Sequence, residues 1–458
     1  MDYSQATRYL ISLGNEIRAS TADGVAAAKL GLENITALLN ELGNPQACYP
    51  SVLIAGTNGK GSVAAMLEAI LRQAGLSTGL YTSPHLVEIS ERIQISGKPV
   101  PPDDFAALFT SLRGRIESLL ATGRLQFHPT YFECLTAMGM EYFRQRGVDI
   151  AVLEVGMGGR LDATNTASAS LSIITQVDFD HERFLGTTIE AIAGEKAGII
   201  KPRGVAVSVA SHPVAAAVIR REAREKSARL VEVWNEYSAT ELVSAEGLYS
   251  FRASHADGFS IPVRLLLRGS HQVENALAAI AGARELTQLG LPINEDAIAH
   301  GLATTEWPGR LEQIRQRPNV FLDGAHNPAG ARALARFWDQ HWRDRRVFLI
   351  YGAMRDKAVP EITETLFPRA AAVILTQPQQ VRATAPETLR DISHDLNASL
   401  LIEPTPAEAL ERALELASPD DIILATGSLF LVGDLRKEVL AQKNAPLRAT
   451  LSTTPAQR

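Results

Sequence analysis

The sequence has few cysteines, no long apolar run and no excess of basic residues. Its two cysteines, Cys48 and Cys134, lie far apart in the 458-residue chain. They give no support to a disulfide framework or a cysteine-ligated metal, and they fit a reducing compartment. No apolar run is long enough to span a bilayer, and the first residues lack the pattern of a secretory signal. A formal net charge of -6 argues against general nucleic-acid binding. These absences predict a cytoplasmic protein that binds neither membranes nor nucleic acids.

What is present is typical of a globular protein of two or three domains. Hydrophobic residues make up 46% of the chain and charged residues 21%. Short apolar runs alternate with stretches of helical spacing, which favours a parallel, doubly wound α/β sheet. In the first part we expect strands at 51–56, 77–83, 149–156 and 171–178 and helices at 61–75 and 130–147.

The strand and helix pattern restarts after a turn-rich segment, TTEWPGRLEQ, at 304–313. The later strands are expected at 319–324, 347–354, 371–377 and 421–428. The final segment is polar and aperiodic, as loose chain ends usually are. We therefore predict a first domain over 1–308, a second over 309–441 and a flexible tail over 442–458.

GTNGKGS, residues 56–62, follows a predicted strand and opens a predicted helix, which is the context of a phosphate-binding loop. Glycines allow backbone N–H groups to approach phosphate oxygens, while the helix N-terminus and Lys60 add positive potential. The alternative is a glycine-rich turn with a surface lysine. In the common loop, a Ser or Thr follows the lysine and binds magnesium. Here Gly61 stands at that position and Ser62 comes one residue later, so the sequence predicts that the metal has ligands elsewhere.

Three candidate metal ligands follow predicted strands: Ser83, Glu154 and His181. A hydroxyl, a carboxylate and an imidazole can complete a magnesium site together with water and nucleotide oxygens, and the imidazole also suits manganese. Taken singly, a Ser-Pro is usually a turn and an Asp-His is usually a surface pair. Parallel strands place the ends of neighbouring strands at one edge of a sheet, so their joint placement favours a shared site.

Other polar residues also follow predicted strands or lie in glycine-rich segments. GMGGRLDATN (156–165) is expected to be a loop that faces a ligand. Spacing alone favours a solvated side chain for Lys196. Asp323 is placed to accept from a ribose hydroxyl, and His326 and Asn327 either bind a polar substrate or cap a helix.

Taken in order, these motifs resemble folylpolyglutamate synthase and dihydrofolate synthase of the Mur ligase superfamily. The resemblance rests on the ordered set GTNGKGS, YTSPHL, HPTYFE, EVGMGGRLDATN, DHERFLG, GEKAGIIKP, HQVENA, WPGRLE, DGAHNP, GAMRDK and GSLFLVGD, and it spans residues 30 to about 435. It implies an N-terminal P-loop ATPase domain with a parallel sheet and a C-terminal Rossmann-like α/β domain. It also implies an ATP-dependent ligase that joins L-glutamate to a folate, or to dihydropteroate, through an acyl phosphate.

The resemblance also implies roles for individual residues. ATP would be bound by Thr57, Asn58, Gly59, Lys60, Gly61, Ser62, Asn275, Arg310 and Asp323. Mg²⁺, or Mn²⁺, would be held by Ser83, Glu154 and His181. Lys196 matches a lysine that is carbamylated in the family, which differs from the solvated side chain that spacing alone favours. Lys60, Lys196 and His326 are the candidate catalytic residues. His326 and Ser428 match positions linked to the incoming glutamate. The pterin side would use Gly31, Leu32, Glu33, Tyr131, Phe132 and Glu133, although Asn34 stands where many relatives have a basic residue.

Two alternatives differ from this expectation. One is another ligase of the superfamily that acts on a cell-wall nucleotide precursor, but the long N-terminal nucleotide-sugar domain is absent and the pterin-side motifs are present. The other is a catalytically silent nucleotide-binding protein, which the presence of Lys60, Glu154, His181 and Lys196 disfavours. The sequence leaves open which folate steps are catalysed and the length of the glutamate chain. We expect a monomer.

Overall fold

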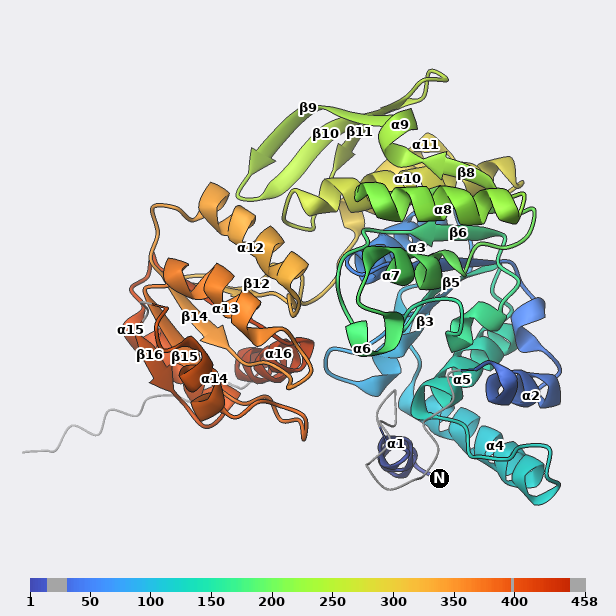
Figure 1. Cartoon of the computed structure of the whole chain (residues 1–458), viewed down its shortest axis with the longest axis horizontal. Helices are drawn as coiled ribbons and strands as arrows, with labels where there is room; N and C mark the ends of the chain where they lie inside the picture. Colours follow the sequence, from blue (N-terminus) through green and yellow to red (C-terminus); the bar gives the residue numbers. More distant parts are fainter. Residues whose placement is uncertain (15–30, 397–398, 445–458) are drawn as a thin grey trace, which may run out of the picture. The chain divides into compact units, whose positions relative to one another are not determined.

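The computed structural model describes residues 1–14, 31–396 and 399–444 and divides into two compact units (Figure 1). Unit 1 comprises Met1–Arg310 with Pro328–Arg343, and unit 2 comprises Leu311–Asn327 with the described part of Asp344–Arg458. Residues 445–458 of the expected tail lie outside the described residues. Within the ranges described, no helix has the length and apolar character needed to cross a membrane.

Unit 1 is built on an eight-stranded sheet in which six neighbouring strands are parallel. The two short strands at one edge are antiparallel. Strand β1 lies between β5 and β6, so the chain moves to one side of β1 first and to the other side later. Such a reversal of strand order is where open α/β sheets bind ligands. In spatial order the strands are β4 (Lys98–Pro99), β3 (Ile93–Ile95), β2 (Thr78–Tyr81), β5 (Ile150–Glu154), β1 (Ser51–Ala55), β6 (Leu171–Ile174), β7 (Val205–Ser208) and β8 (Arg229–Glu232).

Helices cover both faces of this sheet, and the alternation along β1 shows why. Leu53 and Ala55 point into one apolar core, whereas Val52 and Ile54 point into the other. A strand that buries both faces needs apolar residues at every position, and SVLIA meets that need. The first core is covered by α1 (Tyr3–Ser12), α2 (Glu33–Glu41), α4 (Pro102–Ala121), α5 (Tyr131–Arg146), α7 (Ile189–Ala197) and α8 (Pro213–Glu225). The second is covered by α3 (Lys60–Gln73), α10 (His271–Gln288) and α11 (Glu295–Thr304).

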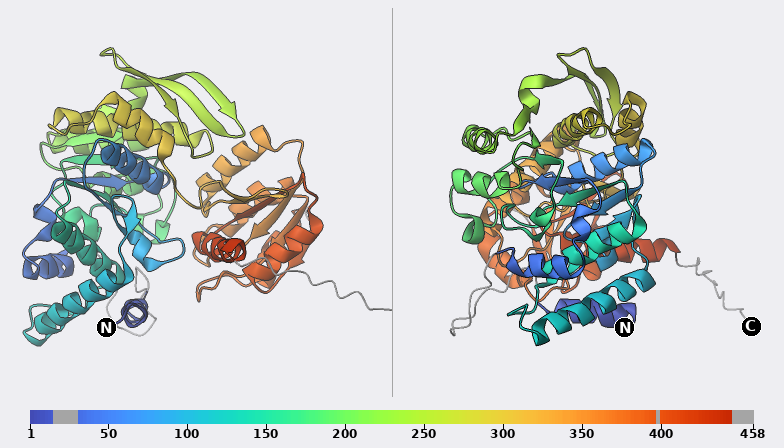
Figure 2. Two further views of the ribbon diagram at one scale, coloured as in Figure 1. Left: turned by 180° about the vertical axis from the view of Figure 1, so that it is seen from behind. Right: turned by 90° about the vertical axis from the view of Figure 1, so that its right-hand side faces the viewer.

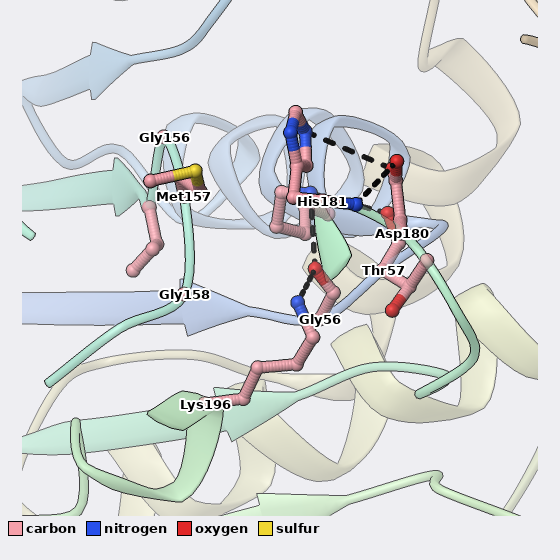
Figure 3. Close-up of a pocket in the computed structure, with 10 residues that line it drawn as sticks. Gly56, Thr57, Gly156, Met157, Gly158, Asp180, His181 and Lys196 are labelled. Carbon is pink, nitrogen blue, oxygen red and sulfur yellow. Dashed lines mark hydrogen bonds and ion pairs between the residues drawn. The ribbon is translucent and has the colours of Figure 1, made fainter. Parts of the chain in front are cut away.

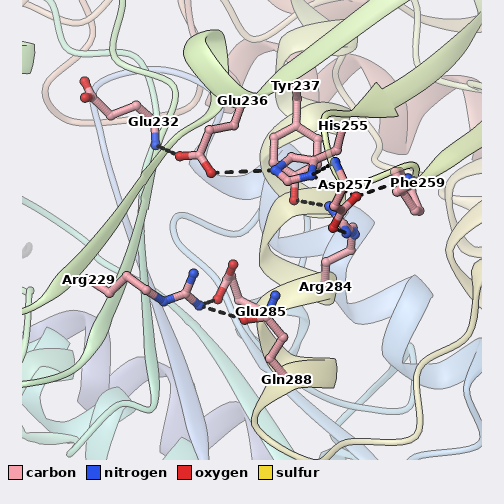
Figure 4. A network of polar contacts seen from close by, with 10 residues as sticks. All are labelled: Arg229, Glu232, Glu236, Tyr237, His255, Asp257, Phe259, Arg284, Glu285 and Gln288. Carbon is pink, nitrogen blue, oxygen red and sulfur yellow. Dashed lines mark hydrogen bonds and ion pairs between the residues drawn. The ribbon is translucent and has the colours of Figure 1, made fainter.

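A three-stranded antiparallel sheet lies beside α10 and α11 and was not anticipated (Figure 2). Arg284 of α10 connects to it: its guanidinium donates to the Tyr237 hydroxyl at 2.9 Å, pairs with Asp257 and lies over the Phe259 ring (Figure 4). Along two of its strands, buried side chains alternate with more exposed ones, as in a sheet that buries only one of its faces. They are β9 (Tyr237–Ala245), β10 (Leu248–His255) and β11 (Ser260–Arg264). The short helix α9 (Val233–Glu236) leads into β9, whereas the short helix α6 (Glu182–Leu185) comes earlier, between β6 and α7.

Unit 2 has a second, mainly parallel sheet with an antiparallel strand at one edge. Its order is β12 (Glu312–Arg315), β13 (Asn319–Leu322), β17 (Ile422–Thr426), β14 (Val347–Tyr351), β15 (Ala372–Leu375) and β16 (Leu400–Ile402). The connecting helices are α13 (Val359–Leu366), α14 (Pro386–Ser393), α15 (Pro406–Leu416) and α16 (Leu429–Asn444). The helix α12 (Pro328–His341) follows β13 in sequence but groups with unit 1 by contact, and the Phe337 ring lies against Gly247. The α/β class and both sheets predicted from the sequence are confirmed.

Candidate active site

The ends of three neighbouring parallel strands of unit 1 surround one pocket (Figure 3). The loop after β1 contributes its phosphate-loop residues, the loop after β5 contributes its glycines, and the loop after β6 contributes an acid and a histidine. Helix α7 adds a lysine. The lining residues are Gly56, Thr57, Lys60, Val155, Gly156, Met157, Gly158, Asp180, His181 and Lys196.

The phosphate loop is fixed to the segment that follows β6. The Thr57 N–H donates to the Gln176 carbonyl at 2.8 Å, and its hydroxyl donates to the Asp178 carbonyl at 2.9 Å. The Thr175 hydroxyl donates to the Asn58 carbonyl at 2.7 Å. Gly59 precedes α3 with φ +90°, a conformation that favours glycine. The loop is therefore held in place by residues 175–178, which directly follow β6.

Two lysines share one backbone carbonyl in the pocket. The Lys60 Nζ donates to Gly56 O at 3.0 Å, and the Lys196 Nζ donates to the same oxygen at 2.9 Å. Lys196 is only 3% exposed, so the solvated side chain expected from spacing alone is wrong. Burial, and then repulsion by Lys60, lowers the pKa of Lys196 to about 7. A substantial fraction of this amine is therefore neutral near neutral pH.

Two of the three expected metal ligands touch each other. The Ser83 N–H donates to the Glu154 Oε2 at 3.2 Å. Burial raises the pKa of Glu154, whereas Lys60 and the hydrogen bond from Ser83 lower it. His181 lines the pocket with a left-handed φ of 53° and lies beside Asp180. A buried carboxylate beside a hydroxyl-bearing loop fits a hard cation such as Mg²⁺. In the described part of the chain, no three acidic, histidine or cysteine side chains form a metal cluster, so such an ion would also need hydroxyl and nucleotide oxygens.

The outer side of the phosphate loop is covered by α10. A Cβ at Gly59 would lie 2.4 Å from the Asn275 Oδ1, so the predicted nucleotide residue Asn275 directly contacts the loop. The Asn275 amide donates to Gln272 at 2.9 Å, and the Gln272 amide reaches the Ser62 hydroxyl at 3.5 Å. Ser62 is buried, and its hydroxyl lies beside α10. Arg310 ends unit 1 and is among the cations that lower the pKa of Glu154.

Asp162 organises the glycine-rich loop and was missed as an individual residue. Its Oδ2 accepts from the Met157 N–H at 2.9 Å, and its Oδ1 accepts from the Thr164 N–H and hydroxyl at 3.0 and 2.6 Å. Gly159 packs against α7 so closely that a Cβ would lie 2.8 Å from the Glu195 carbonyl. This contact explains why a small residue stands there. An acid a few residues after a glycine cluster was the available sequence signal.

The expected pterin-side residues come together around two helix N-termini. Glu133 accepts from the Thr130 N–H at 2.8 Å in a capping box of α5. Burial raises the pKa of Glu133, and the backbone of Ile35 in the first turn of α2 is among the groups that lower it. One carboxylate thus joins the two helices. Gly31, Leu32 and Glu33 lie at the start of α2.

The aromatic candidates on this side are buried against protein groups. Phe132 packs on Gly156, where a Cβ would lie 2.6 Å from its ring, and the Tyr81 ring lies 6.0 Å away. Tyr131 lies under the Arg92 guanidinium, at 5.2 Å from the ring centroid. Arg92 in turn donates to His85 at 3.0 Å, and burial lowers the pKa of His85 to about 3. Of the residues predicted for pterin binding, Phe132 therefore supports the wall of the glycine-rich loop.

In unit 2, the loops after the neighbouring strands β13 and β17 are joined through one carbonyl. The Gly427 N–H donates to Ala325 O at 3.0 Å, and the Thr426 hydroxyl reaches the same oxygen at 3.3 Å. The Asp323 carboxylate accepts from the N–H groups of Leu311 and Ala325 at 3.0 and 2.9 Å. The side chains of His326 and Ser428 bond to backbone groups within these loops: the His326 Nδ1 lies 2.7 Å from the Gly324 carbonyl, and the Ser428 Oγ accepts from the Phe430 N–H at 3.1 Å.

Comparison with known proteins gives consistent matches along the chain. Residues 108–283 match the Mur ligase middle domain, and residues 309–429 match the Mur ligase glutamate ligase domain. The chain is 34% identical to the dihydrofolate synthase/folylpolyglutamate synthase of Bacillus subtilis, over 90% of this chain and 95% of that protein.

Solved structures give the same result. Mycobacterium tuberculosis folylpolyglutamate synthase, solved with ADP and AMPPCP, superposes with a TM-score of 0.87 at 32% identity, covering 96% of this chain and 99% of that one. E. coli FolC in complex with DHPP and ADP gives a TM-score of 0.83 at 29% identity, covering 97% and 99%.

Proposed function

The chain belongs to the Mur ligase family, among the folylpolyglutamate synthases and dihydrofolate synthases, and we propose that it joins L-glutamate to a folate carboxylate with ATP. It is therefore an ATP-dependent carbon–nitrogen ligase. The observation that carries the proposal is the pocket where the phosphate loop, the glycine-rich loop, His181 and Lys196 meet at the ends of three parallel strands.

The reaction has two steps, and each places a demand on the protein. The folate carboxylate takes the γ-phosphoryl group, which gives an acyl phosphate and ADP. The amine of glutamate then attacks the acyl carbon, so a C–N bond forms, the C–O bond to phosphate breaks and the amine loses a proton. Phosphoryl transfer requires mainly positioning and charge neutralisation. Lys60 and the backbone N–H groups at the start of α3 would provide both.

Ser83, Glu154 and His181 are the residues that we propose for Mg²⁺. Bound there, the ion would supply positive charge to the phosphate oxygens during transfer. The contact between Ser83 and Glu154 supports this assignment, as does the place of His181 on the pocket wall. Asn275, Arg310 and Asp323 remain the proposed nucleotide contacts beyond the phosphates.

Lys196 is proposed to carry a carbamate. Its neutral amine would attack CO₂, forming an N–C bond and releasing one proton, so that the buried neutral amine becomes a negatively charged carbamate. The lowered pKa supports this chemistry because only the neutral amine is nucleophilic. A carbamate signal in the ¹³C NMR spectrum after incubation with labelled bicarbonate, absent from Lys196→Met, would support the assignment. A native protein without the signal would contradict it.

His326 and Ser428 are the proposed contacts of the incoming glutamate, and the pterin is proposed to bind near α2 and the start of α5. The relative from Bacillus subtilis is named for both folate activities, which supports dihydropteroate as a second acceptor. We further propose that the protein acts as a monomer in the cytoplasm, with domain boundaries near those predicted. Light scattering after size exclusion tests the monomer.

The proposed function is tested by ADP release from the purified chain with ATP, magnesium and glutamate. Tetrahydrofolate and dihydropteroate are compared as acceptors, and omission of glutamate is the control. Release with both acceptors means a bifunctional enzyme, and release with one identifies its activity. No acceptor-dependent release with either would contradict the folate assignment.

A further inference from the structure

Asn165, at the end of the glycine-rich loop, and Lys201, just beyond α7, have no part in the proposed reaction but contact each other. The Lys201 Nζ donates to the Asn165 carbonyl and to its side-chain Oδ1, both at 2.8 Å. Because an ammonium group can only donate, it fixes which end of the Asn165 amide is the oxygen. The amide nitrogen donates to the Arg160 carbonyl at 3.0 Å and reaches the carbonyl of Gly198, the residue that caps α7, at 3.5 Å. One asparagine therefore connects the glycine-rich loop, the end of α7 and Lys201.

The glycine-rich loop also touches the turn of α7 that carries Lys196. The Arg160 N–H donates to the Glu195 carbonyl at 2.8 Å. A Cβ at Gly159 would lie 2.8 Å from that carbonyl oxygen and 3.0 Å from the Lys196 carbonyl, so the two backbones are in direct contact. A Cβ at Gly198 would lie 2.4 Å from the Arg160 Cβ. Any movement of the loop along α7 would therefore change the contacts of the Lys196 backbone.

The chain between α7 and Lys201 is anchored to the sheet. Ile199 is fully buried, and its carbonyl accepts from the Ser172 hydroxyl of β6 at 2.9 Å. Lys201 therefore extends from a segment that has a fixed place beside β6. The contacts close on themselves: α7 binds the loop at Arg160, the loop continues to Asn165, and Asn165 binds Lys201, which is four residues from the end of α7.

Both partners of this arrangement border the pocket. The loop contributes Met157 and Gly158 to the pocket wall, and α7 contributes Lys196 (Figure 3). The Lys196 Nζ donates to the Gly56 carbonyl at 2.9 Å. Since the contacts fix where α7 lies against the loop, they also limit where the Lys196 amine can lie in the pocket.

A cation at residue 201 lowers the stability of the folded chain. Burial, and then repulsion by Lys226, lowers the pKa of Lys201 to about 8. An apolar side chain would avoid this cost but could not orient the Asn165 amide. Lys226 is a useful comparison because it approaches the same end of α7 from α8: its Nζ reaches the carbonyls of Ala197 and Gly198 at 3.4 Å and pairs with Glu222.

We propose that Asn165 and Lys201 are positioning residues that hold the glycine-rich loop against α7 and thereby place the Lys196 amine in the pocket. They would act through Lys196 and would not need to touch a substrate. The consequence for turnover rests on the proposed function, whereas the placement of the amine can be measured in the protein without any ligand.

The placement is tested by urea unfolding at several pH values in CO₂-free buffer. Each protein is compared with the same protein carrying Lys196→Met, so that the difference in stability reports on this amine alone. In the native protein this difference should begin to rise near pH 7, the folded pKa of Lys196. In Asn165→Ala and in Lys201→Met the loosened pocket admits water, so the rise should begin at least about one pH unit higher.

Two controls separate positioning from a general loss of stability or charge. Lys226→Met removes a cation at the same end of α7, and Lys201→Arg keeps a cation that can donate to Asn165. In both variants the rise should begin near pH 7, as in the native protein. A native onset in Asn165→Ala and Lys201→Met would overturn the proposal, and so would an equal shift in Lys226→Met.

ADP release tests the consequence for the reaction. Asn165→Ala and Lys201→Met should each lower kcat about 10-fold with little change in the KM for ATP. The double variant should lose no more than either single variant because both residues act through one contact. Losses that multiply in the double variant, or an equal loss in Lys226→Met, would contradict a joint positioning role. If the native protein releases no ADP in the presence of folate, the proposed function fails, and the unfolding experiment alone decides the placement of Lys196.

Discussion

The two units use the same rule, polar loops after parallel strands, but they treat charge differently. In unit 1, two charged groups with shifted pKa values are buried: Lys196, whose pKa is lowered to about 7, and Glu154, whose pKa is raised. In unit 2, the polar groups of Asp323 and Ser428 are buried but engaged by backbone N–H groups. The site in unit 1 therefore contains buried charges, whereas the loops of unit 2 hold buried polar groups in fixed positions.

This difference matches the two chemical demands of the proposed reaction. Phosphoryl transfer depends on stabilising charge, and a low local dielectric strengthens the effect of each buried charge. Attack by an amine depends on its position relative to the acyl carbon, which rigid loops can hold. Variants of unit 1 should therefore change charge-dependent behaviour, whereas variants of unit 2 should change substrate positioning.

The largest effect is expected from Lys60→Ala. It removes the cation that would face the transferring phosphoryl group and should lower ligase turnover by about 10³-fold or more, which is about 4 kcal/mol of activation free energy. Lys98→Ala removes an exposed lysine from β4 and serves as the control. Turnover within a few-fold of the native value in Lys60→Ala would refute an electrostatic role for this site.

Lys196 should give the folded state a pH-dependent stability. Its folded pKa of about 7 is below the value of 10.5 in the unfolded chain. Between these pH values the unfolded chain binds a proton that the folded chain lacks, so stability rises as the pH increases from about 7 towards 10. Below about pH 7 the penalty of burying the charge is complete.

The expected rise is on the order of 3 kcal/mol relative to Lys196→Met, which has no such group. Urea unfolding in CO₂-free buffer at several pH values measures it. Bicarbonate should extend the rise to lower pH if a carbamate forms, because the carbamate keeps the folded chain without the proton that the unfolded chain binds. Parallel pH curves for the native and Lys196→Met proteins in CO₂-free buffer would show that the amine is not desolvated.

Gly427→Ala should disturb the geometry of unit 2. Gly427 has φ +104°, and a Cβ there would lie 2.6 Å from the Tyr351 ring and 2.8 Å from the Gly352 carbonyl. We expect a loss of about 2 kcal/mol in the free energy of unfolding beyond that of the control. Gly290→Ala is that control, because Gly290 has φ +101° but open space around it. Equal losses in the two variants would indicate that backbone strain alone matters.

The smallest effect is expected from His326→Ala. Its imidazole bonds to the Gly324 carbonyl and is proposed to position glutamate. The KM for glutamate should rise about 10-fold, which is about 1.4 kcal/mol, with little change in the KM for ATP. Initial rates at varied concentrations of each substrate measure the two constants. Equal increases for both would argue against a role on the glutamate side.

The sequence predicted well those parts that depend on local patterns. The runs at β1, β5 and β6 are continuous and apolar because both faces are buried, and the phosphate loop has its own signature of glycines and Lys60. The sheet β9–β11 was missed because its strands alternate in polarity and lie between strongly patterned segments.

Contacts between distant segments could not be read from the sequence. The burial of Lys196 depends on α7 packing beside the loop after β1, and its spacing gave no sign of this. Two other contacts could not be predicted from the sequence: the Trp307 indole lies beside Gly61, and Glu133 lies near the start of α2. Each of them joins segments that are about 100 residues or more apart.

The activity proposed for this chain is the ATP-dependent attachment of glutamate to a folate. The most direct test incubates it with ATP, magnesium, tetrahydrofolate and ¹⁵N-labelled glutamate, and follows ADP release together with the mass of the folate. We expect one labelled glutamate in the product for each ADP released, and no release when either the acceptor or glutamate is omitted. ADP release that does not depend on the folate, or a folate of unchanged mass, would contradict it.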